Sequence, residues 1–252
     1  MVRRRQLRSQ AGFTLIELVI VLFILAGLAG ILVPFSNTFV QRTHGSTGAS
    51  NIEEITKGVT RFQAEFFTSP NNWESLVVTG GGGLYSFLAN GAGELTAAAL
   101  GGTAAASLVD AGITAIIPMT GTVTNLSATF DSTVGMTPVA PAAAVQAAFV
   151  AGAAIAREFT NAPADPDGDG NPDNDYVAFG LGPNNSMVNR VMVTAPVHTL
   201  EAGNPGTVYA RWLAIYQVAG VESARFIGVV ATDDDGIVGL GGHLAEYYAA
   251  GN

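Results

Sequence analysis

The 252-residue chain contains no cysteine, which excludes disulfide bonds, cysteine metal sites and thiol catalysis. Basic residues are scarce: 11 Lys+Arg stand against 20 Asp+Glu, and the net charge is −9. No basic patch follows the first eight residues, which argues against a nucleic-acid-binding protein. Charged residues make up only 12% of the chain and hydrophobic residues 48%. This balance excludes a disordered polyelectrolyte, because enough apolar material is present to fill a core.

The N-terminus carries the strongest pattern. Four arginines lie within the first eight residues, and the apolar run that follows covers residues 13–33. These 21 residues can cross a hydrocarbon core about 30 Å thick as a helix, and the basic flank places the N-terminus in the cytoplasm. The run is too long for the apolar region of a cleaved secretory signal. Glu17 interrupts it, and a carboxylate in hydrocarbon costs several kcal/mol unless it is paired or reaches the interface.

The segment 12–21 reads GFTLIELVIV and resembles the type III signal of type IV pilins and type II secretion pseudopilins. The resemblance implies that a prepilin peptidase cuts after Gly12 and methylates the new N-terminal residue, Phe13. Glu17 stands where this family keeps a glutamate, and Pro34 stands where many members have a helix-softening proline.

The resemblance also implies a life cycle. The precursor would lie in the bacterial inner membrane as a single-pass protein with its head outside the cytoplasm. Cleaved subunits would then join other copies or related pilins in an extracellular or periplasmic filament whose core is made of apolar helices. In that core the Glu17 carboxylate would pair with the cationic amine of a neighbouring Phe13, which fixes axial register more than it adds stability.

The fold class expected is α+β. The expected organisation is a leader at 1–12, an N-terminal pilin helix at 13–67 and a globular head at 68–252. The Gly/Ser/Thr cluster at 43–48 predicts a break, followed by an amphipathic helix at 49–67 that packs on an antiparallel sheet. The apolar stripe of this second helix consists of Ile52, Ile55, Val59, Phe62 and Phe66. Trp73 and Leu76 are predicted to fold back into the core.

The head is predicted to begin with an Ala/Gly-rich insertion and to end in a β region. Within 80–160 the patterns indicate a weak helix at 94–109, one or two strands at 120–134 and a helix at 141–159 with proline at its first position. Beyond this insertion the predicted strands are 176–181, 188–194, 207–218 and 225–231. Short Gly/Pro/Asn turns between consecutive strands favour an antiparallel meander.

An acidic loop, 165–175, reads DPDGDGNPDND. Its aspartates and its glycine follow the spacing of an EF-hand calcium loop. Tyr176 stands where an EF-hand has its bidentate glutamate, so the loop is similar instead to the calcium loops of repeat modules. The predicted calcium ligands are Asp165, Asp167, Asp169, Asn171 through its backbone oxygen, Asp173 and Asp175. The alternative is a solvated acidic turn.

No catalytic set is visible, and an enzyme is not expected. The three histidines are far apart in the sequence and read as ordinary surface or partly buried residues, while the acidic residues at 233–235 predict a turn after a strand. Three classes stay open: a pilus-like filament subunit, a membrane-anchored calcium-dependent adhesin, and a membrane-anchored enzyme. Within the first class, a pilus and a type II secretion pseudopilus are both compatible with the sequence, as are a major and a minor subunit.

Overall fold

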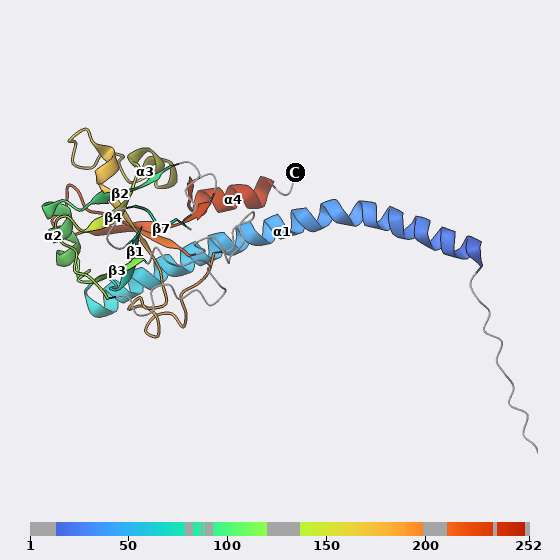
Figure 1. Ribbon diagram of the computed structural model, residues 1–252, viewed down its shortest axis with the longest axis horizontal. Helices are drawn as coiled ribbons and strands as arrows, with labels where there is room; N and C mark the ends of the chain where they lie inside the picture. Colours follow the sequence, from blue (N-terminus) through green and yellow to red (C-terminus); the bar gives the residue numbers. More distant parts are fainter. Residues whose placement is uncertain are drawn as a thin grey trace, which may run out of the picture.

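The computed structural model describes residues 14–78, 83–86, 88, 93–119, 137–198, 211–233 and 236–249, without the side chains of 31–38 and 41. Helix α1 (Leu15–Phe66) contains 52 residues, which corresponds to about 78 Å. Its N-terminal half projects from a globular head formed by the rest of the described chain (Figure 1). The expected leader, 1–12, lies outside the described residues.

Helix α1 is continuous, and the predicted break at 43–48 is wrong. The glycines of this cluster serve packing instead. A Cβ atom on Gly48 would lie 2.7 Å from Nδ1 of His243, and one on Gly45 would lie 2.7 Å from the backbone oxygen of the same residue. Each glycine costs a helix about 1 kcal/mol relative to alanine. The close approach of the C-terminal helix offsets that cost.

That C-terminal helix, α4 (Leu240–Ala249), lies alongside the middle of α1 (Figure 1). Gly48 faces His243, whereas Gly45 also faces the backbone nitrogen of Tyr247. Later residues of α4 therefore meet earlier residues of α1, and the two helices are antiparallel. As a result, the end of α4 lies where the projecting half of α1 leaves the head.

The head is built on a curled, mainly antiparallel sheet with the strand order β2-β4-β5-β6-β7-β8. The strands on this path are β2 (Leu95–Ala99), β4 (Gln146–Val150), β5 (Tyr176–Gly180), β6 (Leu213–Gln217), β7 (Arg225–Asp233) and β8 (Gly236–Val238). Strand β1 (Trp73–Val78) pairs with β5 at Glu74 and runs parallel to β3 (Ile116–Met119). The antiparallel meander predicted for the C-terminal region is confirmed for β5, β6 and β7.

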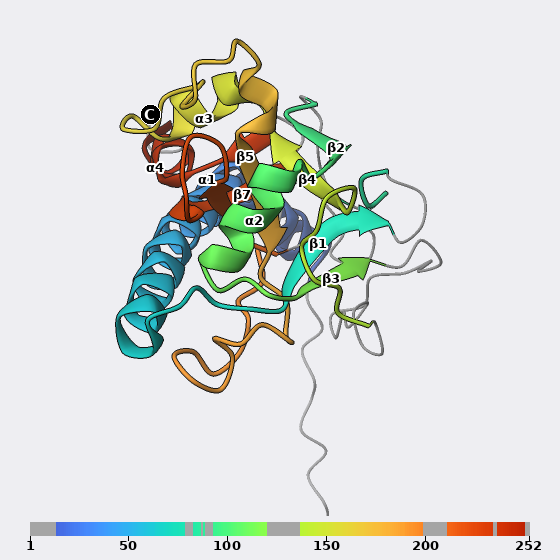
Figure 2. The ribbon, with the colours of Figure 1, turned by 90° about the vertical axis from the view of Figure 1, so that its left-hand side faces the viewer.

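Both faces of the sheet are buried. On β5, Val177 and Phe179 face the cluster that contains α1 and α2 (Gly102–Asp110). Tyr176 and Ala178 face the opposite cluster, which contains α3 (Gly152–Glu158). This alternation follows the two-residue period of a strand. Figure 2 shows α1 and α3 on different sides of the sheet.

The amphipathic half of α1 packs as predicted. Four of its five stripe residues are at most 5% exposed: Ile52, Ile55, Val59 and Phe62. The fifth, Phe66, is 38% exposed, and the guanidinium of Arg190 lies 5.1 Å from its ring centroid. Trp73 and Leu76 are fully buried, as predicted.

The Ala-rich insertion was predicted less well. The segment 94–109 contains β2 as well as α2, and 141–159 contains β4 followed by the short α3 rather than one helix. The two alanine-rich strands pair with each other, with Ala97 opposite Ala148 and Ala98 opposite Ala147. Tertiary pairing of small side chains thus outweighs the helix propensity of alanine. The strands predicted at 120–134 lie outside the described residues.

The strand predicted at 188–194 is also wrong. This segment is a series of turns, in which the N–H groups of Arg190, Val191 and Met192 all donate to the backbone oxygen of Met187. These local hydrogen bonds take the donors that a sheet ladder would need. Strands β7 and β8 pair antiparallel, with Asp233 opposite Gly236; residues 234 and 235 of the predicted turn lie outside the described residues.

Candidate functional site

The N-terminus of α1 is closed by a capping box. The Thr14 hydroxyl accepts a hydrogen bond from the Glu17 N–H at 3.3 Å. The Glu17 carboxylate in turn accepts hydrogen bonds from the Thr14 N–H and hydroxyl, both at 2.8 Å. Glu17 therefore satisfies backbone groups that the first turn leaves open. Gly12 and Phe13 lie outside the described residues, and Pro34 lies within the continuous helix.

The described side chains before the head are exposed and almost all apolar. The exposed fraction is 82% for Leu15, 79% for Phe23 and 73% for Phe39. Within the described part of the chain, no helix is long and apolar enough to cross a membrane. Phe13 and the side chains of 31–33, which belong to the predicted span, lie outside the described residues.

The acidic loop precedes β5 and brings three carboxylates together. Oxygen atoms of Asp165, Asp167 and Asp169 all lie within 4.8 Å of one another. The Asp165 carboxylate accepts hydrogen bonds from the N–H groups of Gly168 (2.7 Å) and Gly170 (3.0 Å). Both glycines have positive φ, 73° and 82°, a conformation that costs glycine little. The loop folds back tightly on its first aspartate.

Asp175 adds a buried carboxylate beside this group. The residue is only 2% exposed, and its Oδ2 atom has no hydrogen-bond partner among the described residues. Burial, and after it the negative charges of Asp167, Asp165, Asp169 and Asp173, raise the pKa of this carboxyl to about 6. A buried anion without a partner is costly, and a cation would relieve that cost.

The other two predicted ligands have protein partners. The Asp173 carboxylate accepts a hydrogen bond from the Gly152 N–H of α3 at 3.2 Å. The backbone oxygen of Asn171, which is the predicted ligand atom, accepts a hydrogen bond from the Asn174 N–H at 3.4 Å. The loop is tied to the sheet at its end, because the backbone oxygen of Asp175 accepts from the Val218 N–H at 2.8 Å. Order in the loop is thus linked to the β5–β6 pair.

The histidines are not the unrelated residues that the sequence suggested. The rings of His198 and His243 lie 5.4 Å apart, and His198 is 4.8 Å from the Trp212 ring in an edge-to-face contact. Burial, then His243 and His44, lower the pKa of His198 to about 4. His243 is 4% exposed, and its Nε2 atom has no hydrogen-bond partner in the described part of the chain. This cluster joins α1, α4 and the sheet, and no sequence spacing signals it because its members lie on separate elements.

Comparison with known families identifies the N-terminal segment. The family model of the prokaryotic N-terminal methylation motif matches residues 7–33. No curated protein and no solved structure matches the chain. The motif is the signature of type IV pilin and pseudopilin precursors, which are structural proteins. The α+β head with its long N-terminal helix is compatible with a pilin-like fold.

Proposed function

We propose that this protein is a structural subunit of a type IV pilus-like filament. The observation that carries the proposal is the methylation motif at 7–33 joined to one continuous helix. That helix is exposed and apolar before the head and buries its stripe within the head. An apolar helix that the head does not cover needs another apolar environment. A membrane before assembly and a filament core afterwards would each provide one.

Processing is the first step to test. Prepilin peptidase would cut between Gly12 and Phe13 and methylate the new N-terminal amine. N-terminal mass spectrometry of assembled material checks this directly. An intact leader in filaments would contradict the proposal. Two alternatives compete with this proposal: a filament subunit of a type II secretion system, and a surface-anchored adhesin. Imaging of pili and secretion assays in a deletion strain separate these alternatives.

Glu17 tests assembly. Its carboxylate would accept a hydrogen bond from the Phe13 amine of a neighbouring subunit within the filament. The substitution Glu17→Ala removes that acceptor but also the capping box with Thr14. Glu17→Gln keeps a side-chain oxygen for the cap and removes the charge, so the two variants separate the roles. Equal loss of incorporation in both variants, with normal membrane insertion, supports the charge pair. Full incorporation of Glu17→Gln would show that only capping matters.

We further propose that the acidic loop binds calcium. The supporting observations are the close group of Asp165, Asp167 and Asp169 and the buried, unpartnered oxygen of Asp175, whose pKa the charges of that group raise. Four carboxylates and a backbone oxygen of Asn171 would give the oxygen-rich shell that calcium prefers. A ligand that binds only the folded state stabilises it by about 2.7 kcal/mol at a hundredfold excess over its dissociation constant.

Thermal melting of the detergent-solubilised chain in calcium and in chelator tests this site. The wild-type protein should melt higher in calcium. The double variant Asp167→Asn/Asp169→Asn should lose the difference, and Asp110→Asn, which removes an exposed aspartate from the end of α2, should keep it. Asp175→Asn should melt higher than wild type in chelator, because a buried charge is removed, and should respond less to calcium. Identical melting of the wild type in both conditions would leave the loop as an acidic turn.

A further inference from the structure

The exposed half of α1 carries two opposite charges. Between residues 9 and 52 the sequence contains one acidic residue, Glu17, and one lysine or arginine, Arg42. Arg42 is exposed and forms no ion pair with any residue that the structure describes. The two residues are 42 − 17 = 25 positions apart, which is about 38 Å along a helix. They cannot meet within one copy of the chain.

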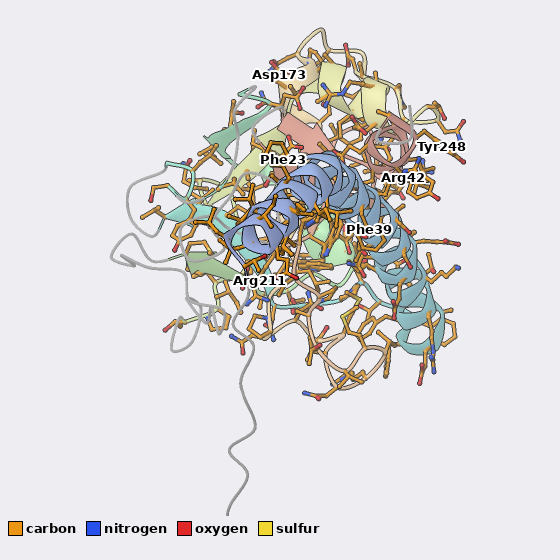
Figure 3. The ribbon with its side chains drawn as sticks, turned by 90° about the vertical axis from the view of Figure 1, so that its right-hand side faces the viewer. Phe23, Phe39, Arg42, Asp173, Arg211 and Tyr248 are labelled. Carbon is orange, nitrogen blue, oxygen red and sulfur yellow. The ribbon has the colours of Figure 1, made fainter. Side chains whose placement is uncertain are left out.

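Arg42 stands in an exposed apolar surface where α4 ends against α1. It precedes Gly45 by one helical turn, and Gly45 faces the Tyr247 backbone of α4. Figure 3 shows Arg42 between Phe39 and Tyr248 as the head is viewed along the projecting helix. The apolar residues of this surface, here called the α4 patch, are Phe39 (73% exposed), Val40 (47%), Leu244 (40%), Tyr247 (38%) and Tyr248 (69%). Arg42 is the one arginine or lysine on this surface, and the one acidic residue that α4 carries, Glu246, lies 3.4 Å from His243 Nδ1.

The N-terminal end of α1 offers the complement. Residues three, four and seven positions after Glu17 share its helix face, and they are Ile20, Val21 and Ile24, each about half exposed. This face therefore presents a single anion in an apolar surround. Alignment of Glu17 with Arg42 brings Ile20 level with Gly45, since 45 − 25 = 20, and hence next to the end of α4.

We propose that the α4 patch of one copy binds the N-terminal end of α1 of a second copy, with the Glu17 carboxylate accepting hydrogen bonds from the Arg42 guanidinium. The inference rests on the proposed filament function and specifies its register. Copies that insert into one membrane with the same orientation have parallel helices, as this alignment requires. The contact joins two different surfaces, so repetition extends an open assembly instead of closing a dimer. The two Thr14 hydrogen bonds of the capping box use Oε2 of Glu17, so Oε1 is the oxygen left for the Arg42 guanidinium.

A second copy fits the patch better than lipid does. Arg42 is nine residues beyond the end of the apolar run at Val33, which places it about 14 Å along the helix. The headgroup region on one side of a bilayer is only about 5–8 Å thick. When the run spans the membrane upright, the α4 patch therefore stands above the lipid surface.

Engineered cysteines test this contact cleanly, because the chain has no cysteine of its own. Ile20→Cys combined with Tyr248→Cys should give a ladder of crosslinked copies with a short thiol crosslinker in assembled filaments. Ile20→Cys combined with Phe67→Cys is the matched control: Phe67 is 92% exposed but lies 67 − 45 = 22 residues beyond Gly45 along the chain, about 33 Å away. Filaments that contain the 20/248 variant without crosslinks, or equal crosslinking in the control, would overturn the proposal.

Charge variants test the pair itself. Arg42→Gln should reduce incorporation into filaments about tenfold, the loss expected for one hydrogen bond to a charged group. Arg42→Glu should reduce it further, and Arg42→Lys should retain most of it. Arg61→Gln, which removes a basic residue paired with Glu65 on the same helix, should incorporate normally. Incorporation is measured relative to the membrane precursor pool. Normal incorporation of Arg42→Glu overturns the register, whereas failure of the wild-type chain to enter filaments overturns the proposed function instead.

Discussion

The two halves of α1 are one helix with opposite surroundings. From about residue 49 onward, one stripe is buried against the sheet, and Val59 is completely inaccessible. Before residue 41 the described side chains are exposed on every side of the helix. Hydrophobic residues occur in both halves, so hydrophobicity alone does not distinguish them. The difference lies in pattern: a stripe predicts packing within the head, whereas a uniformly apolar helix requires a partner that the head does not supply.

The boundary between these halves is the place where α4 packs against α1. Gly45 and Gly48 let the backbone of α4 approach α1, and the ring of His243 fills the space that side chains would take. Without this contact, the apolar stripe would be fixed to the sheet but the projecting half would leave the head without lateral support. The glycines that the sequence marks as a break are the positions where the helix is held.

The largest expected change in the free energy of unfolding distinguishes the two halves of α1 directly. Phe62→Ala should lower the free energy of unfolding by about 3–5 kcal/mol, because it leaves a cavity in a packed core. Phe23→Ala removes the same side chain from an exposed site and should change this free energy by less than about 0.5 kcal/mol. Chemical denaturation of the detergent-solubilised chain measures both. Equal destabilisation by the two variants would mean that the projecting half packs on its own head.

Lowering the pH should reduce the free energy of unfolding by up to about 3 kcal/mol through the histidine cluster at this boundary. The pKa of His198 is lowered to about 4 by burial and by its histidine neighbours. The stabilisation that this neutral ring provides is therefore complete above pH 6.5 and is lost as pH falls toward 4. His198→Phe keeps a ring beside Trp212 and should flatten the dependence of melting temperature on pH in that window. An unchanged pH profile in this variant would show that the cluster does not titrate with folding.

The smallest effects come from two glycines of the same helix. Gly48→Ala should destabilise the head by about 1–3 kcal/mol, since the new Cβ meets the His243 ring. Gly27→Ala has open space around it and should stabilise the helix by up to about 1 kcal/mol. Circular dichroism and thermal melting of the solubilised chain check that the first variant is destabilised and the second stabilised. A stabilising Gly48→Ala would mean that α4 does not pack closely against α1.

The sequence was most informative where a periodic pattern extended over several turns or strands. The α1 stripe was predicted from its helical period, and the strands β5 and β7 from their β-branched and aromatic residues between Gly, Pro and Asn turns. The alanine-rich segments were predicted poorly. Alanine fits a helix and a crowded central strand alike, and the pairing of β2 with β4 depends on a partner about 50 residues away.

In the candidate sites, too, local features were predictable from the sequence, whereas features that depend on distant elements were not. The spacing of Asp165, Asp167 and Asp169 is local, and the structure places their carboxylates together. Asp175 was proposed as a ligand, but its burial depends on the sheet beneath the loop and could not be derived from the loop sequence. The contact of His198 with His243 and the role of Gly45 depend on how distant elements dock. Such contacts leave no trace in local spacing.

The antiparallel course of α4 also determines where foreign sequence can be attached. Any chain that continues from Ala249 starts beside the point where α1 leaves the head (Figure 1). A reporter fused there would compete for space with whatever binds the projecting helix. Phe67, which is 92% exposed in a left-handed turn at the opposite end of α1, offers a display position that leaves this region open. An epitope inserted after Phe67 should be accessible to antibody on the assembled protein, whereas a bulky C-terminal fusion should block assembly.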